Sequence, residues 1–172
     1  MSRSKVEKLG DSIAIFDLPN KETKDTNATL AAIQTLEKRS FPSSESLVMK
    51  LEASKRNSRV IYAQTSSSVI VGYLLYISTS NNLRIHKVCV AETFRRRKIA
   101  TRMITRVCKV AEKVGKEIDL WVDEARIPGR ECYVACGFRE DGPVVVDYYG
   151  PGRNGIRMVW SSGVSDEVMQ AL

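Results

Sequence analysis

The sequence predicts an α/β fold in which a mixed β-sheet carries helices on both of its faces. Apolar residues recur at helical spacing in four segments and alternate or run together in seven shorter ones. Three of the strand segments follow one another in the middle of the chain, and helices are interleaved on either side of them. The 172 residues contain no repeat and no linker. We therefore expect one domain over residues 1–172, with loose tails at 1–10 and 162–172.

The first third of the chain is predicted to form one strand and two helices. Residues 12–17 (SIAIFD) alternate as a strand does, and residues 28–39 carry apolar side chains at helical spacing. The Phe-Pro pair at 41–42 ends that helix, because the residue before a proline is pushed out of the α region. A second helix is expected over residues 43–55, with Ser43 or Ser44 as its N-cap. Its inward-facing side chains are expected to be Leu47, Val48 and Leu51.

Three strands are predicted next. Residues 59–65 and 69–77 are rich in β-branched and aromatic side chains, and the three serines between them suit the turn of a hairpin. Gly72 interrupts the second strand, which indicates a bulge or a close approach of two backbones. The third strand covers residues 83–90.

The second half alternates helices and strands. A long amphipathic segment starts at Ile99 without a proline or glycine break, and Gly115 is its expected C-cap. A strand is predicted at residues 118–122, followed by a short helix at 128–137 that begins with a proline. The two remaining strands are expected at residues 144–149 and 156–160.

Composition excludes several classes of protein. No apolar run reaches the length of a membrane span, and the first twelve residues lack the apolar centre of a secretory signal. We therefore expect a protein of the cytoplasm, and also of the nucleus, without a membrane partner. The single histidine, His86, argues against a histidine-built metal site, so no metal is expected. The cysteines are interpreted as small core or boundary residues, not as a disulfide frame or zinc site; they are Cys89, Cys108, Cys132 and Cys136.

A run of four cations at residues 95–98 (RRRK) lies between the predicted strand 83–90 and the long helix. The first N–H groups of a helix are unpaired and lie at the positive end of its dipole. A basic loop that leads into them is a site for a phosphate-bearing ligand. The net charge of +7 agrees with an anionic partner. The alternative is a solvated basic turn between two ordinary elements.

The order of the elements, with the residues at their junctions, resembles the GNAT superfamily of acetyl-CoA-dependent N-acetyltransferases from about residue 13 to 160. The family's pyrophosphate motif, R/Q-x-x-G-x-G/A, matches at Arg95 and Ala100, whereas Lys98 stands where glycine is usual. A lysine at helical φ still donates its N–H, so we expect weakened geometry but a retained site. The resemblance implies a mostly antiparallel sheet of about seven strands, four helices on its two faces, and acetyl-CoA as cofactor. It assigns the cofactor to Val88, Cys89, Val90, Arg95, Arg96, Arg97, Lys98, Ile99, Ala100 and Thr101.

A second matching segment supplies a candidate acid. Tyr133, Gly137 and Phe138 are similar to the family's Tyr-x-x-x-Gly-Phe segment, whose tyrosine can protonate the departing thiolate. The resemblance also places the oxyanion donor on a backbone N–H at residues 88–90. The plainer interpretation of Tyr133 is an aromatic core residue on a short helix.

Two further segments resemble the branch that acetylates N-terminal α-amines, including the ribosomal-protein (RimI-like) group. In that branch two loops close over the first residues of a protein chain, so the acceptor would be a protein or peptide N-terminus. The plainer interpretation makes the first segment a helix stop and the second a strand with one tyrosine facing in. The residues assigned to the acceptor are Phe41, Pro42, Ser43, Arg84, Tyr148 and Tyr149.

The general base is not at its usual place. The RimI-like group often has a glutamate twelve residues before the tyrosine, and here that residue is Trp121. His86 is the substitute we expect, because strand alternation puts it on one face with Arg84 and Val88. A structural role for His86 is the alternative, and a base acting through water is another. Carboxylates that also qualify are Asp119, Asp123 and Glu124.

The missing glutamate favours an α-amine acceptor. At neutral pH roughly a fifth of an α-amine is uncharged, against about one lysine side chain in a thousand. Lysine acetylation therefore demands about 3–4 kcal/mol more of the base. Lysine and small-molecule amines stay open as acceptors, as does a catalytically weak partner subunit that binds acetyl-CoA. A nucleic-acid-binding module is disfavoured, because aromatic residues do not interleave with the basic run. An auxiliary subunit or the ribosome is a further partner to consider.

Overall fold

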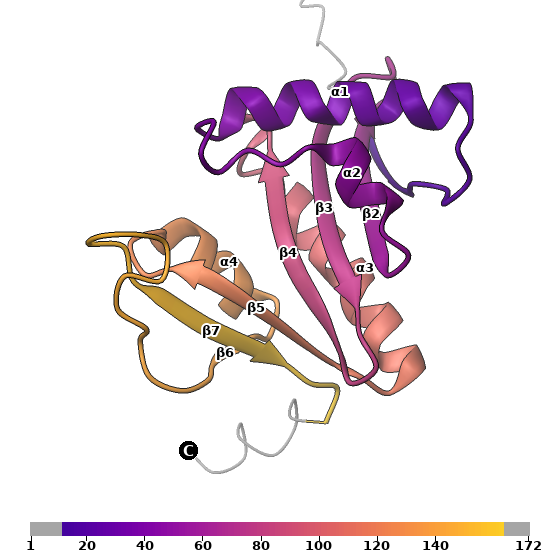
Figure 1. Cartoon of the computed structure of the whole chain (residues 1–172). Coiled ribbons are helices and arrows are strands. Elements are labelled where there is room, and N and C mark those ends of the chain that lie inside the picture. Colours follow the sequence, from indigo (N-terminus) through magenta and orange to yellow (C-terminus); the bar gives the residue numbers. More distant parts are fainter. Residues whose placement is uncertain (1–11, 164–172) are drawn as a thin grey trace, which may run out of the picture.

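In the computed structural model, which describes residues 12–163, a seven-stranded sheet has the strand order β1-β2-β3-β4-β5-β7-β6 (Figure 1). Only β4 and β5 pair in parallel, so the predicted mixed and mostly antiparallel sheet is confirmed. The strands are β1 (Ile13–Asp17), β2 (Ser58–Thr65), β3 (Ile70–Ser78), β4 (Asn82–Val90), β5 (Glu117–Asp123), β6 (Arg139–Glu140) and β7 (Gly155–Trp160). The helices are α1 (Lys24–Ser40), α2 (Met49–Ser54), the short 3-10 helix η1 (Glu92–Phe94), α3 (Ile99–Val114) and α4 (Ile127–Ala135). The tails expected at 1–10 and 162–172 lie outside the described residues, apart from a turn at 162–163.

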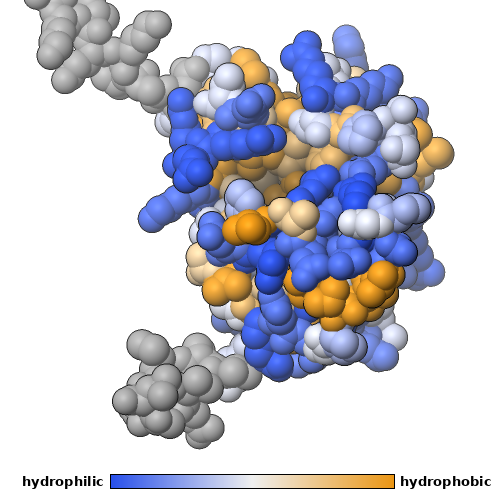
Figure 2. Space-filling view, turned by 90° about the vertical axis from the view of Figure 1, so that its left-hand side faces the viewer, coloured by the Kyte–Doolittle hydropathy of each residue, from blue (hydrophilic) through white to orange (hydrophobic). Residues whose placement is uncertain are grey.

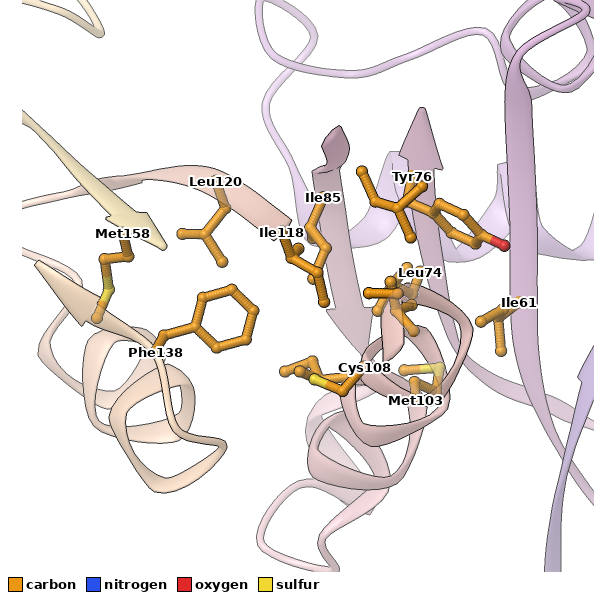
Figure 3. Packing of buried hydrophobic residues seen from close by; sticks show 14 of the residues in the cluster. Ile61, Leu74, Tyr76, Ile85, Met103, Cys108, Ile118, Leu120, Phe138 and Met158 are labelled. Atoms are coloured by element: carbon orange, nitrogen blue, oxygen red, sulfur yellow. The ribbon is translucent and has the colours of Figure 1, made fainter. Parts of the chain in front are cut away.

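Two hydrophobic clusters hold helices on opposite faces of the sheet. On one face α3 buries residues such as Met103 and Ile104 against β2 to β5, and Phe138 packs beside Leu120 and Met158 (Figure 3). On the other face α1 and α2 bury Ile33 and Met49 against β2 and β3. Figure 1 shows α1 lying across the sheet and α3 behind it. None of the helices within residues 12–163 is long and apolar enough to cross a membrane.

The first helix begins earlier than predicted. The sequence predicts this helix over residues 28–39, but α1 starts at Lys24, within a polar stretch. Thr23 is its N-cap: its hydroxyl accepts from the Thr26 N–H at 3.1 Å, and the Thr26 hydroxyl accepts from the Thr23 N–H at 2.7 Å. This reciprocal pair satisfies two N–H groups that would otherwise be unpaired, which outweighs the polar composition of the first turn.

The predicted second helix is too long at its start. Residues 43–45 form a turn, and α2 covers only Met49–Ser54, although it ends where expected. Val48 and Leu51 were predicted to face inward, but 56% and 62% of their surfaces are exposed, and Met49 is the buried residue. Side chains of α1 explain the difference, because they fix the backbone of residues 47–49 in an extended path, as described below.

The long helix α3 has both ends as predicted. It starts at Ile99 and ends at Val114, and its buried residues lie on one face. Gly115 follows with φ of 65°, the left-handed conformation in which glycine avoids the cost of a Cβ atom. Its N–H donates to the carbonyls of Ala111 and Glu112, which closes the last turn.

The strand predicted at 144–149 does not form. Val145 makes a single bridge to Gly155, and residues 146–149 are turns; 72% of the Val146 surface is exposed. The seventh strand is instead β6, which pairs with β7 through Arg139 and Glu140. The β-propensity of three consecutive valines favours a strand, but the tertiary packing of the turn outweighs this propensity.

Candidate active site

The parallel strands β4 and β5 separate halfway along their length. They pair only from Asn82–Ile85 to Glu117–Leu120. Beyond that point β5 and β7 turn away from β4, as Figure 1 shows. The edge of β4 from residue 86 to 90 is therefore left without a ladder partner on the β5 side, and its free N–H groups face the opening between the strands.

A cavity of about 340 Å³ occupies this opening. It contains Tyr133, His86 and Val88, so the structure brings together the two candidate catalytic residues and the start of the expected oxyanion segment. From the side where β5 ends and β7 begins, hydrophilic residues surround a recess with a hydrophobic floor (Figure 2). The complete lining is Phe41, Glu45, Leu47, His86, Lys87, Val88, Trp121, Val122, Asp123, Arg126, Gly129, Tyr133, Tyr149 and Arg153.

The N-terminus of α3 offers free backbone donors. No side chain caps it, and the first intrahelical bond joins the Arg102 N–H to the Lys98 carbonyl at 3.0 Å. The N–H groups of Ile99, Ala100 and Thr101 are therefore available to a ligand. The four cations of residues 95–98 are all exposed around them. Unpaired N–H groups beside exposed cations are what a phosphate site at a helix N-terminus requires, and phosphate binding here stays a prediction.

Lys98 does not have the helical φ that we expected from the sequence. Its φ and ψ are 57° and 22°, in the left-handed region, and Arg96 has φ of 60°. The loop thus keeps the backbone conformation that glycine adopts without strain, although neither residue is glycine. Each non-glycine residue in this region costs about 1–2 kcal/mol. The departure from the motif therefore costs conformational energy.

Tyr133 lies on α4 with its ring tilted against Phe138, at 5.8 Å between centroids. The backbone N–H groups of Cys136 and Phe138 donate to its carbonyl, which fixes the end of the helix around it. Burial, followed by the charges of neighbouring groups, raises the pKa of Tyr133 above its usual value of about 10. The phenol therefore remains protonated at neutral pH and can donate its proton.

His86 reaches the cavity by a different route from the predicted alternation. Leu75 pairs with Lys87 and Tyr76 with Ile85, so His86 is the extra residue of a bulge in β4. The bulge reverses the faces beyond it, and Val88 packs on the α3 side. The prediction that His86 shares a face with both Arg84 and Val88 is therefore wrong. Partial burial lowers the pKa of His86, so the imidazole is neutral at pH 7 and able to accept a proton.

The three carboxylates that also qualified as bases are engaged elsewhere. Asp119 is buried beneath Arg84, whose Nε and Nη2 donate at 3.0 and 2.7 Å. Burial opposes its ionisation, but the hydrogen bonds from Arg84 and then Arg157 outweigh it and lower the pKa of Asp119. Neither Arg84 nor Asp119 lines the cavity.

Asp123 does line the cavity, but it accepts from the Ala125 N–H at 3.0 Å and from Arg153 Nε at 2.8 Å. These bonds lower the pKa of Asp123 against the effect of burial. Glu124 accepts from Asn154 at 2.9 Å outside the cavity. Within residues 12–163, His86 is the lining group that can take a proton without first breaking a hydrogen bond or ion pair.

Trp121, at the position of the usual glutamate, lines the cavity and stacks on Tyr148. Tyr148 in turn packs over Gly155, where an added Cβ would lie only 2.6 Å from the Tyr148 ring. Of the two tyrosines predicted to touch the acceptor, Tyr149 lines the cavity and Tyr148 does not. Burial, and secondly the charge of Tyr148, raises the pKa of Tyr149 to about 12.

The acceptor segment, residues 41–48, forms the opposite wall through Phe41, Glu45 and Leu47. Pro42 and Ser43, which we predicted to touch the acceptor, sit in an exposed turn that does not line the cavity. Their role stays a prediction. Cys89 and Ile99 are also buried, so their contribution to a ligand is limited to the backbone.

Two side chains of α1 hold the acceptor segment in place. Gln34 donates to the Leu47 carbonyl at 2.9 Å and accepts from the Met49 N–H at 2.8 Å. Glu37, which is fully buried, accepts from the Leu47 N–H at 2.8 Å, from Lys87 Nζ at 2.5 Å and from the Tyr73 hydroxyl. A buried carboxylate is stable only when its oxygens are satisfied in this way. Glu37 therefore joins the acceptor segment to β3 and β4.

A second group of charges closes the cavity on its outer side. Glu45 pairs with Arg126 at 3.3 Å and with Arg153, which also pairs with Asp123. The acceptor segment, the start of α4 and the loop before β7 therefore meet at Glu45. Sequence analysis missed Glu45, Lys87, Arg126 and Arg153, because they belong to no motif. The sequence offers one feature that could have identified them: each lies close in sequence to a predicted site segment.

Comparison with known proteins agrees with this geometry. The family model described as "Acetyltransferase (GNAT) family" matches residues 28–138. No curated protein sequence matches the chain. Within the part of the chain that the structure describes, no three His, Cys, Asp or Glu side chains gather to hold a metal ion.

Solved structures with the same fold include enzymes with different acceptors. The ribosomal-protein-S18-alanine N-acetyltransferase of Escherichia coli superposes with a TM-score of 0.71 at 16% identity, covering 91% of this chain and 97% of that one. Arabidopsis thaliana NAA60 in complex with a bisubstrate analogue gives 0.69 at 15% identity, covering 87% and 98%. An aminoglycoside 6′-N-acetyltransferase complexed with coenzyme A gives 0.69 at 15% identity, covering 87% and 96%. At these identities the likeness establishes the fold and leaves the acceptor open.

Proposed function

Since the chain belongs to the acetyltransferase (GNAT) family and is an acetyl-CoA-dependent acetyltransferase, we propose that its acceptor is the α-amine of a protein or peptide N-terminus. The observation that carries this proposal is the set of proton acceptors in the cavity. Trp121 replaces the usual glutamate, Glu45 and Asp123 are ion-paired, and His86 has a lowered pKa. Such a site suits an amine that is already partly neutral at pH 7.

The residues available to hold acetyl-CoA fit its anionic pyrophosphate. The N–H groups of Ile99, Ala100 and Thr101 and the cations of residues 95–98 provide donors and positive charge at one place. The free edge of β4 at residues 88–90 provides N–H groups for the developing oxyanion. When bound, acetyl-CoA supplies the thioester that the amine attacks.

The side chains of the cavity then divide the proton transfers. His86 takes the proton that the amine must lose, directly or through one water molecule. Tyr133 keeps its proton because its pKa is raised, and donates it to the departing thiolate. The two groups line one cavity from β4 and α4, on either side of the separating strands. Their environments push their proton affinities in opposite directions, which is the condition for one base and one acid to act at the same pH.

The walls of the cavity suit the first residues of a peptide. Phe41 and Leu47 provide apolar contact on one side, and Tyr149 lies on the other. The ion pairs of Glu45 with Arg126 and Arg153 join these walls on the outer side, so a peptide whose chain leaves on that side has to displace them. An enzyme named for an alanine of ribosomal protein S18 has the same fold, so the fold is compatible with this acceptor class.

Release of thiol from acetyl-CoA, measured with matched acceptors, tests the proposal. The acceptors are peptides with a free N-terminus and no lysine, the same peptides with an acetylated N-terminus and one lysine, and an aminoglycoside. We expect turnover with the free N-termini, about a hundredfold or more slower turnover with the blocked lysine peptides, as the ratio of their neutral fractions requires, and slower turnover with the aminoglycoside. Equal rates on blocked lysine peptides would overturn the α-amine assignment.

A small-molecule amine is the second candidate. Two carboxylates, Glu45 and Asp123, line the cavity and could exchange their arginine partners for the ammonium groups of a polycation. The structural likeness to an aminoglycoside enzyme is consistent with this acceptor. Preference for the aminoglycoside in the panel above would favour it over a peptide.

A further inference from the structure

Cys132 and Cys136 form a pair of thiols that acetyl transfer does not use. They lie four residues apart, Cys132 in the last turn of α4 and Cys136 at its C-cap, and both are half-buried and unbridged. The Cys132 sulfur also lies 3.9 Å from the Thr101 hydroxyl in the first turn of α3. Neither cysteine lines the cavity of the candidate active site. The other two cysteines, Cys89 and Cys108, are buried.

The two thiols have complementary properties. The hydrogen bond from Cys136 lowers the pKa of Cys132 to about 6, against the opposing effect of burial and with a smaller contribution from Thr101. The same contact, together with burial, raises the pKa of Cys136, so this thiol keeps its proton. The proximity of the two thiols therefore favours a thiolate on one sulfur beside a protonated thiol on the other. A partly accessible thiolate next to a second cysteine is the arrangement that oxidants attack most readily.

We infer that Cys132 and Cys136 form a redox-active dithiol, which a hydroperoxide oxidises to a disulfide that displaces Tyr133 and stops acetyl transfer. In the first step the Cys132 thiolate attacks one peroxide oxygen, and the O–O bond breaks to give a sulfenic acid and hydroxide or alkoxide. In the second step Cys136 loses its proton, its sulfur attacks the sulfenic sulfur, and water leaves as the S–S bond forms. The two thiols are oxidised by two electrons and the hydroperoxide is reduced by two.

Helix geometry explains why this bond must move Tyr133. Residues four apart on a helix have Cβ atoms about 5–6 Å apart, whereas a disulfide requires about 3.5–4.5 Å. The backbone between the two cysteines has to shift to close the difference, and Tyr133 is the first residue of that stretch. Its carbonyl accepts from the Cys136 and Phe138 N–H groups at 3.0 and 3.1 Å. A shift of Cys136 therefore loosens the bonds that hold Tyr133 in the cavity.

Peptide mapping of the full chain tests the chemistry without relying on activity. Trypsin cleaves after Arg130 and Arg139, which leaves both cysteines in one peptide, residues 131–139. After limited hydrogen peroxide we expect this peptide to be lighter by two hydrogens, and dithiothreitol to restore it. Cys136→Ser should stop at the sulfenic acid, trapped at Cys132 by dimedone, and Cys132→Ser should react much more slowly. Cys108→Ala is the control with a thiol removed outside the pair, and it should still form the disulfide.

Activity and binding are measured on the same samples. Oxidation should reduce kcat by about tenfold or more, and the reductant should restore it. Cys132→Ser/Cys136→Ser should be as active as the reduced wild type and insensitive to peroxide. No disulfide in the 131–139 peptide, or first oxidation at Cys136, would overturn the inference. A disulfide without loss of activity would contradict the displacement of Tyr133. Disulfide formation is independent of the proposed acceptor, because the mapping contains no acceptor.

Discussion

Trp121 and Tyr148 stack with ring centroids 4.3 Å apart and 12° between their planes, at the position where related enzymes often carry a glutamate. The stack fills the place of a carboxylate base with two apolar surfaces. It also holds the turn at residues 146–149 against β5 and β7. The conformation of this turn therefore depends on one aromatic contact, and under the proposed function acceptor selectivity depends on it too.

Placing a carboxylate at position 121 should broaden the acceptor range. Trp121→Glu restores a base beside the cavity, so the ratio of kcat/KM for lysine peptides to that for free N-termini should rise by about tenfold. The glutamine of Trp121→Gln is nearly the same size as the glutamate of Trp121→Glu but cannot act as a base. In this variant the ratio of kcat/KM for lysine peptides to that for free N-termini should stay at the wild-type value. Both variants lose the aromatic pair, which contributes about 1 kcal/mol beyond area burial, so the free energy of unfolding should fall by at least that amount in both. An equal ratio in the Glu and Gln variants would contradict a role for the missing carboxylate.

Tyr133→Phe should remove the acid and leave the fold intact. The ring keeps its contact with Phe138, while the thiolate departs without a proton donor. We expect kcat to fall by about a hundredfold or more, with the CoA dissociation constant within about twofold of wild type. Tyr149→Phe is the matched control, because that phenol also lines the cavity. Parallel losses of turnover and CoA affinity in Tyr133→Phe would show a packing role instead.

The pH dependence of kcat/KM should contain the titration of His86. The partly buried imidazole has a lowered pKa and must be neutral to act as base, so activity falls when the pH drops through this value. The acceptor amine titrates higher, at about 7.7–8.0, and already makes the rate fall with decreasing pH. The profile should therefore become steeper below the pKa of His86.

His86→Gln should remove the titration of the imidazole from the pH profile of kcat/KM and keep that of the acceptor amine. The same shift affects stability: between the lowered pKa and about 6.5 the unfolded chain binds more protons than the folded one. The contribution of His86 is thus fully present above pH 6.5 and is lost as the pH falls. Profiles of equal steepness in wild type and His86→Gln would exclude His86 as the base.

Lys98→Gly should stabilise the protein relative to Lys98→Ala. Alanine retains the Cβ atom that is unfavourable at φ of 57°, whereas glycine does not. We expect a difference of about 1 kcal/mol in the free energy of unfolding, measured with urea. Both variants remove the same charge, so the comparison isolates backbone strain from electrostatics. Alanine as stable as glycine would mean that the loop relaxes out of the left-handed region.

Local chemistry explains which parts of the structure could be predicted. Both ends of α3 were predicted correctly, because they depend on residues adjacent in sequence. These are the basic run before Ile99 at the start and Gly115 at the end. The hairpin of β2 and β3 was also correct, including a bulge at the Gly72 region, where Val71 is the extra residue. Tyr133 was predicted to lie in the site and does line the cavity, because its position relative to Gly137 and Phe138 depends on the one short helix α4.

The wrong predictions concern segments whose conformation is set by residues far away in the sequence. Gln34 and Glu37 hold residues 47–49 extended, which delays α2, and nothing near Ser43 in the sequence reveals this. The bulge at His86 changes the face of Val88, and strand alternation has no means to detect one extra residue. The charges around Glu45 come from three separate segments, so their meeting is a property of the tertiary fold alone.

The contact between Tyr148 and Gly155 restricts how related chains can vary. Because the tyrosine ring occupies the space of a side chain at position 155, a residue with a Cβ atom is compatible with this fold only if the turn at 146–149 takes another path. Substitutions at the two positions should therefore occur together among homologues. Chains that keep glycine at 155 can retain an aromatic residue at 148, and those that lose the glycine must rebuild the turn at 146–149 beside the cavity.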